Sequence, residues 1–275
     1  MKTGKLYICP TPLGNLEDIT LRVLRILQEV SLIAAEDTRH TRKLLNHFSI
    51  RTKLTSYYEH NKTKKKSILM DFLLNGQDIA LVSDAGMPGI SDPGEELVCA
   101  AVELRIPVVP LPGPTALITA LVASGLPAAP FAFYGFPPAR GAARREFLNK
   151  LIFEEKTLVF YEAPHRLIKT LTELANASAD RKVVVAREMT KIHEEFVRGT
   201  LHDVLTHFRE VNPRGECTVI LTSANNNIEI DLSPLELVNK FQSSGMTKKD
   251  AIRETAKCLS LPRNEIYRLL LENKE

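Results

Sequence analysis

The sequence predicts an α/β fold of two lobes followed by a small all-helical extension, and three patterns indicate it. Short apolar runs of strand length alternate with segments of helical periodicity, which is typical of βαβ units. A turn-rich stretch at residues 125–130 (Gly-Leu-Pro-Ala-Ala-Pro) interrupts that alternation. A run of three asparagines at 225–227 precedes a tail of helical periodicity. We therefore expect domains at residues 1–124, 125–225 and 226–275.

The first domain is expected to hold a mostly parallel sheet. Its strand-like runs cover residues 6–9, 31–35, 53–57, 79–83 and 108–111. Helical patterns between and after them cover residues 21–28, 41–48, 63–74, 95–104 and 114–124. A helix between two strands returns the chain through a right-handed crossover, so that neighbouring strands run in the same direction.

The second domain is expected to hold a mixed sheet. Its strand-like runs cover residues 131–135, 157–161, 182–186, 195–198 and 218–222, and its helical patterns cover 144–151, 166–175 and 201–209. No helix separates residues 195–198 from the strand before them. A direct connection of this kind joins antiparallel strands.

The tail from Ser233 onward is expected to be all-helical. Thr247 is a candidate helix cap, because apolar residues recur after it at helical spacing. A short break at residues 260–262 separates two helical patterns, which together resemble a helix-turn-helix. A nucleic-acid contact and a packing or dimerisation element are both open for this tail.

The composition is that of an ordinary soluble globular protein, with 275 residues, 44% hydrophobic and 25% charged. No apolar run approaches the roughly 18–20 residues of a membrane-spanning helix, and the first residues carry no secretory apolar region. The four cysteines, Cys9, Cys99, Cys217 and Cys258, lie far apart in the sequence. We expect reduced thiols and a cytoplasmic protein without a membrane partner.

Positive charge is concentrated in one segment of the first domain. From Arg39 to Lys66 the chain has nine basic residues and one acidic residue, Glu59, which is a local net charge of +8 against +3 for the whole chain. Solvated helix faces are one interpretation of such a run, and a polyanionic partner is the other. Because the rest of the chain is net acidic, the contrast favours the partner.

Glycine, proline and polar residues follow every predicted strand of the first domain. These loops cover residues 10–16, 36–39, 58–61, 84–94 and 112–116. Open parallel sheets bind ligands beyond the carboxyl ends of their strands, so we expect a cleft at this edge. Three common motifs, Gly-x-Gly-x-x-Gly, Gly-Lys-Ser/Thr and Gly-x-Ser-x-Gly, are missing from the chain. Acidic and histidine residues lack metal-ligand spacing, and no metal is expected.

Several of these loops have long and specific sequences. Residues 83–94 read Ser-Asp-Ala-Gly-Met-Pro-Gly-Ile-Ser-Asp-Pro-Gly, residues 35–39 read Ala-Glu-Asp-Thr-Arg, and residues 162–166 read Glu-Ala-Pro-His-Arg. With the loops at 10–15, 112–116, 133–138 and 187–195, they resemble the ribosomal RNA small-subunit methyltransferase I family. That family belongs to the tetrapyrrole (corrin/porphyrin) methylase superfamily. The resemblance covers about residues 6–225, and the helical tail is similar to that family's C-terminal extension.

The resemblance implies a two-lobed tetrapyrrole-methylase-like fold that binds S-adenosyl-L-methionine in the cleft between its lobes, often as a homodimer. Residues 83–86 align with the superfamily's Gly-Asp-Pro cofactor loop, in which Ser83 and Ala85 replace the glycine and the proline. The implied cofactor-binding residues are Pro12, Asp84, Ala85, Gly86, Ile90, Thr115, Ala116 and Tyr161.

The resemblance also implies methylation of the ribose 2′-hydroxyl of a cytidine in the decoding region of small-subunit (16S) ribosomal RNA. A hydroxyl is a weak nucleophile until a base accepts its proton. The candidate acceptors are Asp37, Glu36 and His165. Asp37 is equally well placed to cap the helix that follows it, and His165 is open to a structural role.

Basic residues near the proposed cleft are candidate contacts to RNA phosphates. They are Arg39, Arg42, Lys43, Lys64, Lys65, Arg144, Arg145, Arg166 and Arg187. Arg187 is alternatively a member of an ion pair within its lobe. Tyr57, Tyr58 and His60 are candidates for stacking on an unpaired base, and Tyr57 is equally plausible in the core.

Two other functions stay open from the sequence. A methyltransferase of the same fold could act on a small tetrapyrrole, although such a substrate needs neither the basic segment nor the helical tail. A non-catalytic nucleic-acid-binding protein could use the tail for recognition and bind no cofactor. Within the RNA interpretation, the substrate is either free small-subunit RNA or the assembled small subunit.

Overall fold

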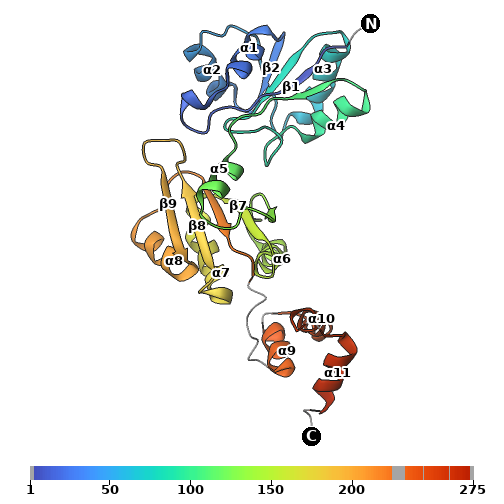
Figure 1. The fold of residues 1–275 in the computed structure, drawn as a ribbon. Helices are drawn as coiled ribbons and strands as arrows, with labels where there is room; N and C mark the ends of the chain where they lie inside the picture. The colour runs from blue at the N-terminus through green and yellow to red at the C-terminus, as the bar shows by residue number, and fades with distance from the viewer. Residues whose placement is uncertain (1–2, 225–232, 244, 260, 273–275) are drawn as a thin grey trace. The chain divides into compact units, whose positions relative to one another are not determined.

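The chain folds into two compact units, residues 1–223 and 224–275, in a computed structural model that describes residues 3–224, 233–243, 245–259 and 261–272 (Figure 1). The first unit contains both α/β lobes. The predicted linker at 225–227 and the first residue of the predicted break at 260–262 lie outside the described residues.

The first lobe is built on a five-stranded parallel sheet in the order β3-β2-β4-β1-β5. Its strands are β1 (Leu6–Ile8), β2 (Leu32–Ala35), β3 (Leu54–Ser56), β4 (Ile79–Val82) and β5 (Val108–Pro110). Every residue of β2 and β4 is buried, as expected for central strands that are covered on both faces. The predicted parallel sheet is confirmed.

Helices cover both faces of this sheet, namely α1 (Leu21–Glu29), α2 (Thr38–His47), α3 (Lys62–Leu74) and α4 (Glu95–Glu103), with a short 3₁₀ turn at Leu16–Asp18. Alternate residues of β2 belong to opposite cores, because successive side chains of a strand point to opposite faces. Ile33 packs in the core that holds Val23 of α1, and Leu32 packs in the core that holds Leu69 of α3.

The second lobe has a mixed sheet in the order β6-β7-β10-β8-β9, in which only β6 and β7 pair in parallel. Its strands are β6 (Phe131–Phe133), β7 (Thr157–Glu162), β8 (Lys182–Arg187), β9 (Glu195–Thr200) and β10 (Cys217–Leu221). The helices α6 (Gly141–Ile152), α7 (Pro164–Ser178) and α8 (Leu201–Glu210) share one core with this sheet. The predicted mixed sheet is confirmed.

Helix α5 (Ala116–Ala123) packs on the other face of the second sheet. Leu117 and Leu121 of this helix share a core with Val159 and Ile220. The expected domain boundary after residue 124 therefore separates α5 from the sheet that it covers. Turn residues mark where the chain reverses, whereas the apolar surface that a helix covers is decided by packing.

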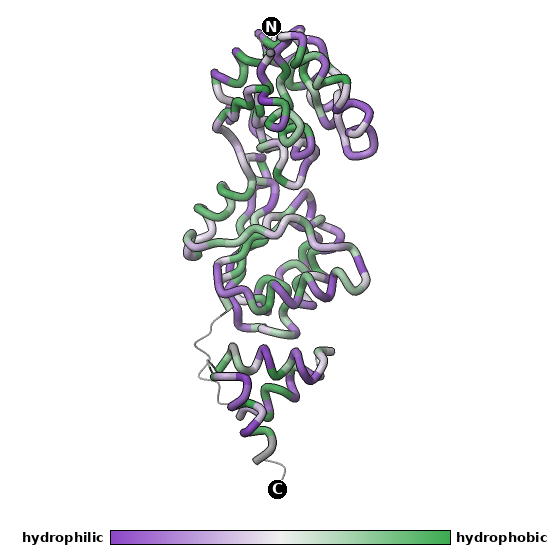
Figure 2. Tube along the Cα trace, turned by 90° about the vertical axis from the view of Figure 1, so that its right-hand side faces the viewer, coloured by the Kyte–Doolittle hydropathy of each residue, from purple (hydrophilic) through white to green (hydrophobic). Residues whose placement is uncertain are grey.

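The second unit consists of α9 (Pro234–Ser243), α10 (Lys248–Cys258) and α11 (Arg263–Glu272) around a small core. Phe241, Ile252 and Ile266 contribute one buried side chain from each helix. Figure 2 shows apolar and polar residues alternating along these helices, as amphipathic helices require. Over the described residues, no helix combines the length and the apolar character needed to cross a bilayer.

Candidate active site

A pocket of about 860 Å³ lies at the carboxyl edge of the first sheet and is lined by residues of both lobes. The strand-end loops contribute residues 11–14, 83–87 and 90–92, and the second lobe contributes Phe136, Tyr161 and residues 215–218. A second hollow, of about 630 Å³, lies at the opposite edge beside residues 49–53. The pocket at the carboxyl edge is where ligands of parallel α/β sheets bind.

The floor of this pocket is a rigid junction between the first loop and the loop after β4. Thr11 and Gly86 exchange two backbone hydrogen bonds, each 2.9 Å long. Gly86 has φ +79°, and a Cβ at this position would lie 3.3 Å from Cδ2 of Leu13. Glycine therefore fits here better than any other residue. The Thr11 hydroxyl also donates to the Ser83 carbonyl at 3.1 Å, which ties the two loops together.

The structure brings all eight of the predicted cofactor-binding residues into the lining of this one pocket. They come from the first loop, the loop after β4, the start of α5 and the end of β7. The eight residues are Pro12, Asp84, Ala85, Gly86, Ile90, Thr115, Ala116 and Tyr161. Their convergence from four separate segments gives the pocket its shape.

Carboxyl groups are concentrated at the pocket. Asp84, Asp92 and Glu216 line it, and Glu36 lies close enough to influence the pKa of Asp92. Burial raises the pKa of Asp92 from 3.8 to about 7, with a further contribution from Glu36, while the Ser83 hydroxyl opposes the shift. Burial, and then the Asp84 charge, raise the pKa of Glu36 as well. Such an environment favours a bound cation or a protonated carboxyl.

Asp92 and Glu216 are site residues that the sequence interpretation missed. Asp92 lies within the recognised 83–94 sequence, so that motif was a signal for it. Glu216 precedes β10 and reaches the pocket only because β10 pairs with β7 next to Tyr161. His40 and His47 also line the pocket beside Lys43. Their spacing along α2 places the three on one helical face.

The three predicted proton acceptors have different surroundings. Asp37 is the N-cap of α2, and its carboxylate accepts from the Arg39 backbone at 2.7 Å and from the Arg39 guanidinium at 3.2 Å. These bonds hold its pKa below the ordinary value, and the helix-cap alternative is confirmed. His165 is exposed in the first turn of α7. None of the three lines the pocket; Glu36 and Asp37 are both half-buried, and His165 is exposed.

Exposed basic residues lie on the helices that follow β2 and β3. Arg39, Arg42 and Lys43 are exposed on α2, and Lys64 is exposed on α3. Lys43 also lines the pocket. Lys65 is half-buried and donates to the Thr55 hydroxyl at 2.9 Å. In the second lobe, Arg145 is exposed on α6.

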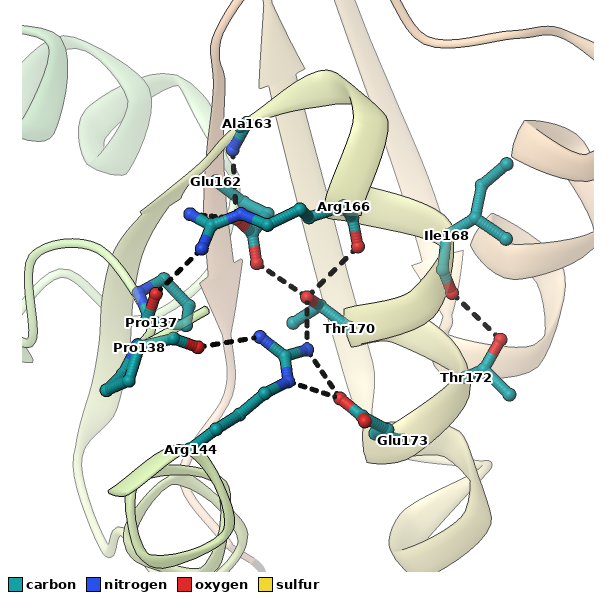
Figure 3. Close-up of polar contacts among 10 residues, drawn as sticks. All are labelled: Pro137, Pro138, Arg144, Glu162, Ala163, Arg166, Ile168, Thr170, Thr172 and Glu173. Carbon is teal, nitrogen blue, oxygen red and sulfur yellow. Dashed lines mark hydrogen bonds and ion pairs between the residues drawn. The ribbon is translucent and has the colours of Figure 1, made fainter. Parts of the chain in front are cut away.

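Three arginines that were predicted to contact RNA are instead committed within the second lobe. Arg144 is 4% exposed and donates to Thr170 at 2.9 Å, to the Pro138 carbonyl at 3.2 Å and to Glu173 (Figure 3). Arg166 pairs with buried Glu162 at 2.8 Å, and Arg187 pairs with Glu195. The prediction of RNA contact is wrong for Arg144, because the sequence does not reveal which carboxylates surround a cation. For Arg187 the ion-pair alternative is confirmed.

Of the aromatic candidates for base stacking, Tyr57 belongs to the core. It is 1% exposed and packs with residues of α3 and α4. Tyr58 and His60 are exposed, and their ring centroids lie 6.3 Å apart. Among the residues that the structure describes, no group of three His, Cys, Asp or Glu side chains is arranged to hold a metal ion.

Comparison with known proteins gives close relatives along nearly the whole chain. The family model of the tetrapyrrole (corrin/porphyrin) methylases matches residues 5–205. A Halalkalibacterium halodurans protein named ribosomal RNA small subunit methyltransferase I is 46% identical, over 97% of this chain and 94% of that protein. A protein of the same name from Synechocystis is 47% identical, over 98% of both chains.

Solved structures share the fold at much lower identity. Uroporphyrin-III C-methyltransferase from Thermus thermophilus, complexed with S-adenyl homocysteine, has a TM-score of 0.56 at 21% identity and covers 80% of this chain and 98% of its own. Diphthine synthase has a TM-score of 0.62 at 12% identity and covers 80% of this chain and 90% of its own. The chain therefore belongs to the tetrapyrrole (corrin/porphyrin) methylase family and, within it, to the ribosomal RNA small subunit methyltransferase I family.

Proposed function

We propose that this protein transfers a methyl group from S-adenosyl-L-methionine to the ribose 2′-hydroxyl of a cytidine in the decoding region of 16S ribosomal RNA. One observation carries the proposal: four separate segments bring the eight cofactor-type residues into a single pocket that contains carboxyl groups and the exposed cation Lys43. Relatives that are 44–47% identical bear the name of a small-subunit RNA methyltransferase. The proposed substrate is either the assembled small ribosomal subunit or its free RNA.

The pocket suits S-adenosyl-L-methionine in size and in charge. Its volume of about 860 Å³ is within the usual range of ligand sites, roughly 300–1,000 Å³. Asp84 and Glu216 would balance the positive sulfur and ammonium groups of the cofactor. Thr115, the N-cap of α5, makes no side-chain cap bond, so a cofactor carboxylate would meet an uncapped helix start, although the Leu117 backbone there already bonds Tyr161. When bound, the cofactor supplies a methyl group on a positively charged sulfur.

We assign Asp92 as the acceptor of the ribose proton, with Glu36 beside it. A ribose hydroxyl needs a base in the transition state, and a base with a pKa near the operating pH is the most effective. Asp92 lines the pocket, and burial raises its pKa to about 7. Asp37, in contrast, is held ionised by Arg39 and is a weaker base.

The exposed cations are proposed to bind RNA phosphates. Arg39, Arg42 and Lys43 of α2 form one group, with Lys64 on α3 and Arg145 on α6 as further contacts. Such contacts release counterions, so binding should weaken steeply as salt is added. Lys65 and Arg166 are proposed to support this surface through their neighbours, since each is already bonded within the protein.

We further propose that the protein acts in the cytoplasm as a homodimer. Helix α5 is apolar except for Thr119, and its residues Ile118 and Val122 are 41% and 69% exposed. A second copy of the chain would cover this face and remove its apolar surface from water. Light scattering of the wild type and of Val122→Asp tests the assembly: a dimer is expected for the former and a monomer for the latter.

The test of the main proposal is methyl transfer from tritiated cofactor to small ribosomal subunits that lack their native methylations. Label in the 16S RNA that nucleoside analysis assigns to 2′-O-methylcytidine supports the proposal. Asp84→Asn should abolish the label and weaken cofactor binding in calorimetry. If the protein bound the cofactor but transferred no methyl group to RNA, a small tetrapyrrole would become the favoured substrate. A folded protein that bound no cofactor would refute the enzymatic function.

A further inference from the structure

Phe136 is a large apolar side chain at the rim of the pocket. It lines the pocket and is 39% exposed. Its ring centroid lies 5.4 Å from that of Tyr161, which is one of the eight cofactor-type residues. One part of the Phe136 ring therefore packs against the pocket wall and another part meets solvent. An exposed aromatic ring at such a place is suited to stack on a planar group that enters from outside.

The backbone on the C-terminal side of Phe136 is held by two guanidinium groups. Arg166 donates to the Pro137 carbonyl at 3.0 Å, and Arg144 donates to the Pro138 carbonyl at 3.2 Å (Figure 3). On the other side, the Gly135 carbonyl accepts from the Tyr161 amide at 2.9 Å. The segment that carries Phe136 is thus fixed from both directions.

The two arginines belong to a buried network in which every charge has a partner. Glu162 is 0% exposed and pairs with Arg166 at 2.8 Å. The Thr170 hydroxyl donates to Glu162 and accepts from Arg144 at 2.9 Å. Buried ion pairs contribute little net stability compared with apolar packing, and their best-attested benefit is a defined geometry. Here the network fixes the carbonyls of Pro137 and Pro138 (Figure 3), which directly follow Phe136 in the chain.

We propose that Phe136 is the surface on which a base of the RNA substrate stacks, and that Arg144, Glu162 and Arg166 are positioning residues that hold it. The proposal rests on the proposed function, which requires an RNA substrate. A ribose that is modified inside a pocket must leave its helical stack, which costs stacking energy. An aromatic ring at the rim restores part of that energy, whichever base is presented.

Steady-state kinetics on small ribosomal subunits test the role of Phe136. Phe136→Ala should raise KM for subunits by about 5- to 150-fold, the range of one lost base–aromatic stack, and should leave the affinity for S-adenosylhomocysteine unchanged. Phe136→Tyr keeps an aromatic ring and should have the same KM for subunits as the wild type. The matched control is Phe131→Ala, because Phe131 is 38% exposed but does not line the pocket; its KM should equal that of the wild type.

A double-mutant cycle tests the positioning residues. If Arg166 acts through Phe136, Arg166→Ala should raise KM in the wild type and add nothing in the Phe136→Ala background. Independent effects of the two changes on KM would refute the positioning of Phe136 by Arg166. Because the chain has no tryptophan, Phe136→Trp introduces a single one, and the tryptophan emission should change with subunit RNA fragments and not with S-adenosylhomocysteine.

Two outcomes would overturn the proposal. Weaker S-adenosylhomocysteine binding by Phe136→Ala, with KM for subunits unchanged, would make Phe136 part of the cofactor site. Kinetics of Phe136→Ala that match those of Phe131→Ala would leave Phe136 without a role in recognition. Failure of the proposed function is a separate result, since the wild-type enzyme would then transfer no methyl group to subunits.

Discussion

Replacement of Thr170 by valine removes one hydroxyl from the buried network of the second lobe. Thr170 is 0% exposed, and its hydroxyl joins the Glu162 carboxylate to the Arg144 guanidinium. Valine has nearly the same shape, so the change leaves Glu162 Oε2 without this donor and opens no large cavity. Glu162 Oε1 keeps its bonds from Ala163 and Arg166. The change therefore removes two hydrogen bonds with charged groups and a 3.1 Å bond to the Arg166 carbonyl of the same helix.

The expected loss of unfolding free energy is about 2–4 kcal/mol, since a hydrogen bond to a charged group contributes about 1.5–3 kcal/mol and Arg144 retains other partners. For a folded unit of this size, the midpoint of thermal unfolding should fall by roughly 4–16 °C. Circular dichroism during heating and during urea titration would measure both quantities. A change in the urea midpoint without a change in slope would identify a stability effect.

Thr172→Val is the matched control on the same helix. The Thr172 hydroxyl donates at 2.8 Å to the Ile168 carbonyl of its own helix (Figure 3), a bond that helices do not need. Its removal should change stability by no more than about 0.5 kcal/mol. Equal stability of the two variants would refute the argument that the Glu162–Thr170–Arg144 bonds hold the lobe together.

Three further changes test the pocket and its rim. The pKa of Asp92 is about 7 in the folded protein, against an ordinary value of 3.8. The protonated carboxyl therefore stabilises the fold fully below pH 4, and this stabilisation is lost as the pH rises through 7. Asp92→Asn should accordingly unfold at a higher urea concentration than the wild type at pH 8 and at the same concentration at pH 4. In the wild type, kcat/KM should rise as the pH passes about 7, because the Asp92 carboxylate forms there. If Asp92→Asn showed the same rise of kcat/KM with pH, another residue would be the base. Gly86→Ala should weaken S-adenosylhomocysteine binding at least tenfold. Gly125 also has a positive φ, but an added Cβ would meet no atom within 4 Å, so Gly125→Ala should lower stability and leave binding unchanged. Equal affinities of the two variants in calorimetry would contradict the role of the Gly86 turn. Lys43→Glu should weaken RNA binding and reduce the slope of log affinity against log salt concentration by about 0.7–0.9 per lost phosphate contact. Lys156 is also exposed, and Lys156→Glu should change neither the affinity nor the slope. Filter binding at several salt concentrations measures both quantities.

Local patterns predicted the secondary structure of this chain closely. The run at 79–83 became β4 (Ile79–Val82), and the helical pattern at 21–28 became α1 (Leu21–Glu29). Both depend on neighbouring residues only, that is, on apolar periodicity and on a cap such as Thr20, whose hydroxyl accepts from the Val23 amide. The all-parallel first sheet followed from the alternation of strands and helices, since a crossover helix permits only that direction.

The partners of charged and aromatic residues were decided by the tertiary structure. Arg144 and Arg145 are neighbours in sequence, yet Arg144 is buried against Glu173 and Arg145 is exposed, because a helix turns successive side chains toward different surroundings. Glu216 entered the pocket through the pairing of β10 with β7, across a long stretch of chain. The loop sequences predicted eight residues that line the pocket, whereas strand pairing in the folded chain added Glu216. The pKa of Asp92 and the burial of Glu162 required the folded chain, because desolvation and charge coupling depend on distances that only packing sets.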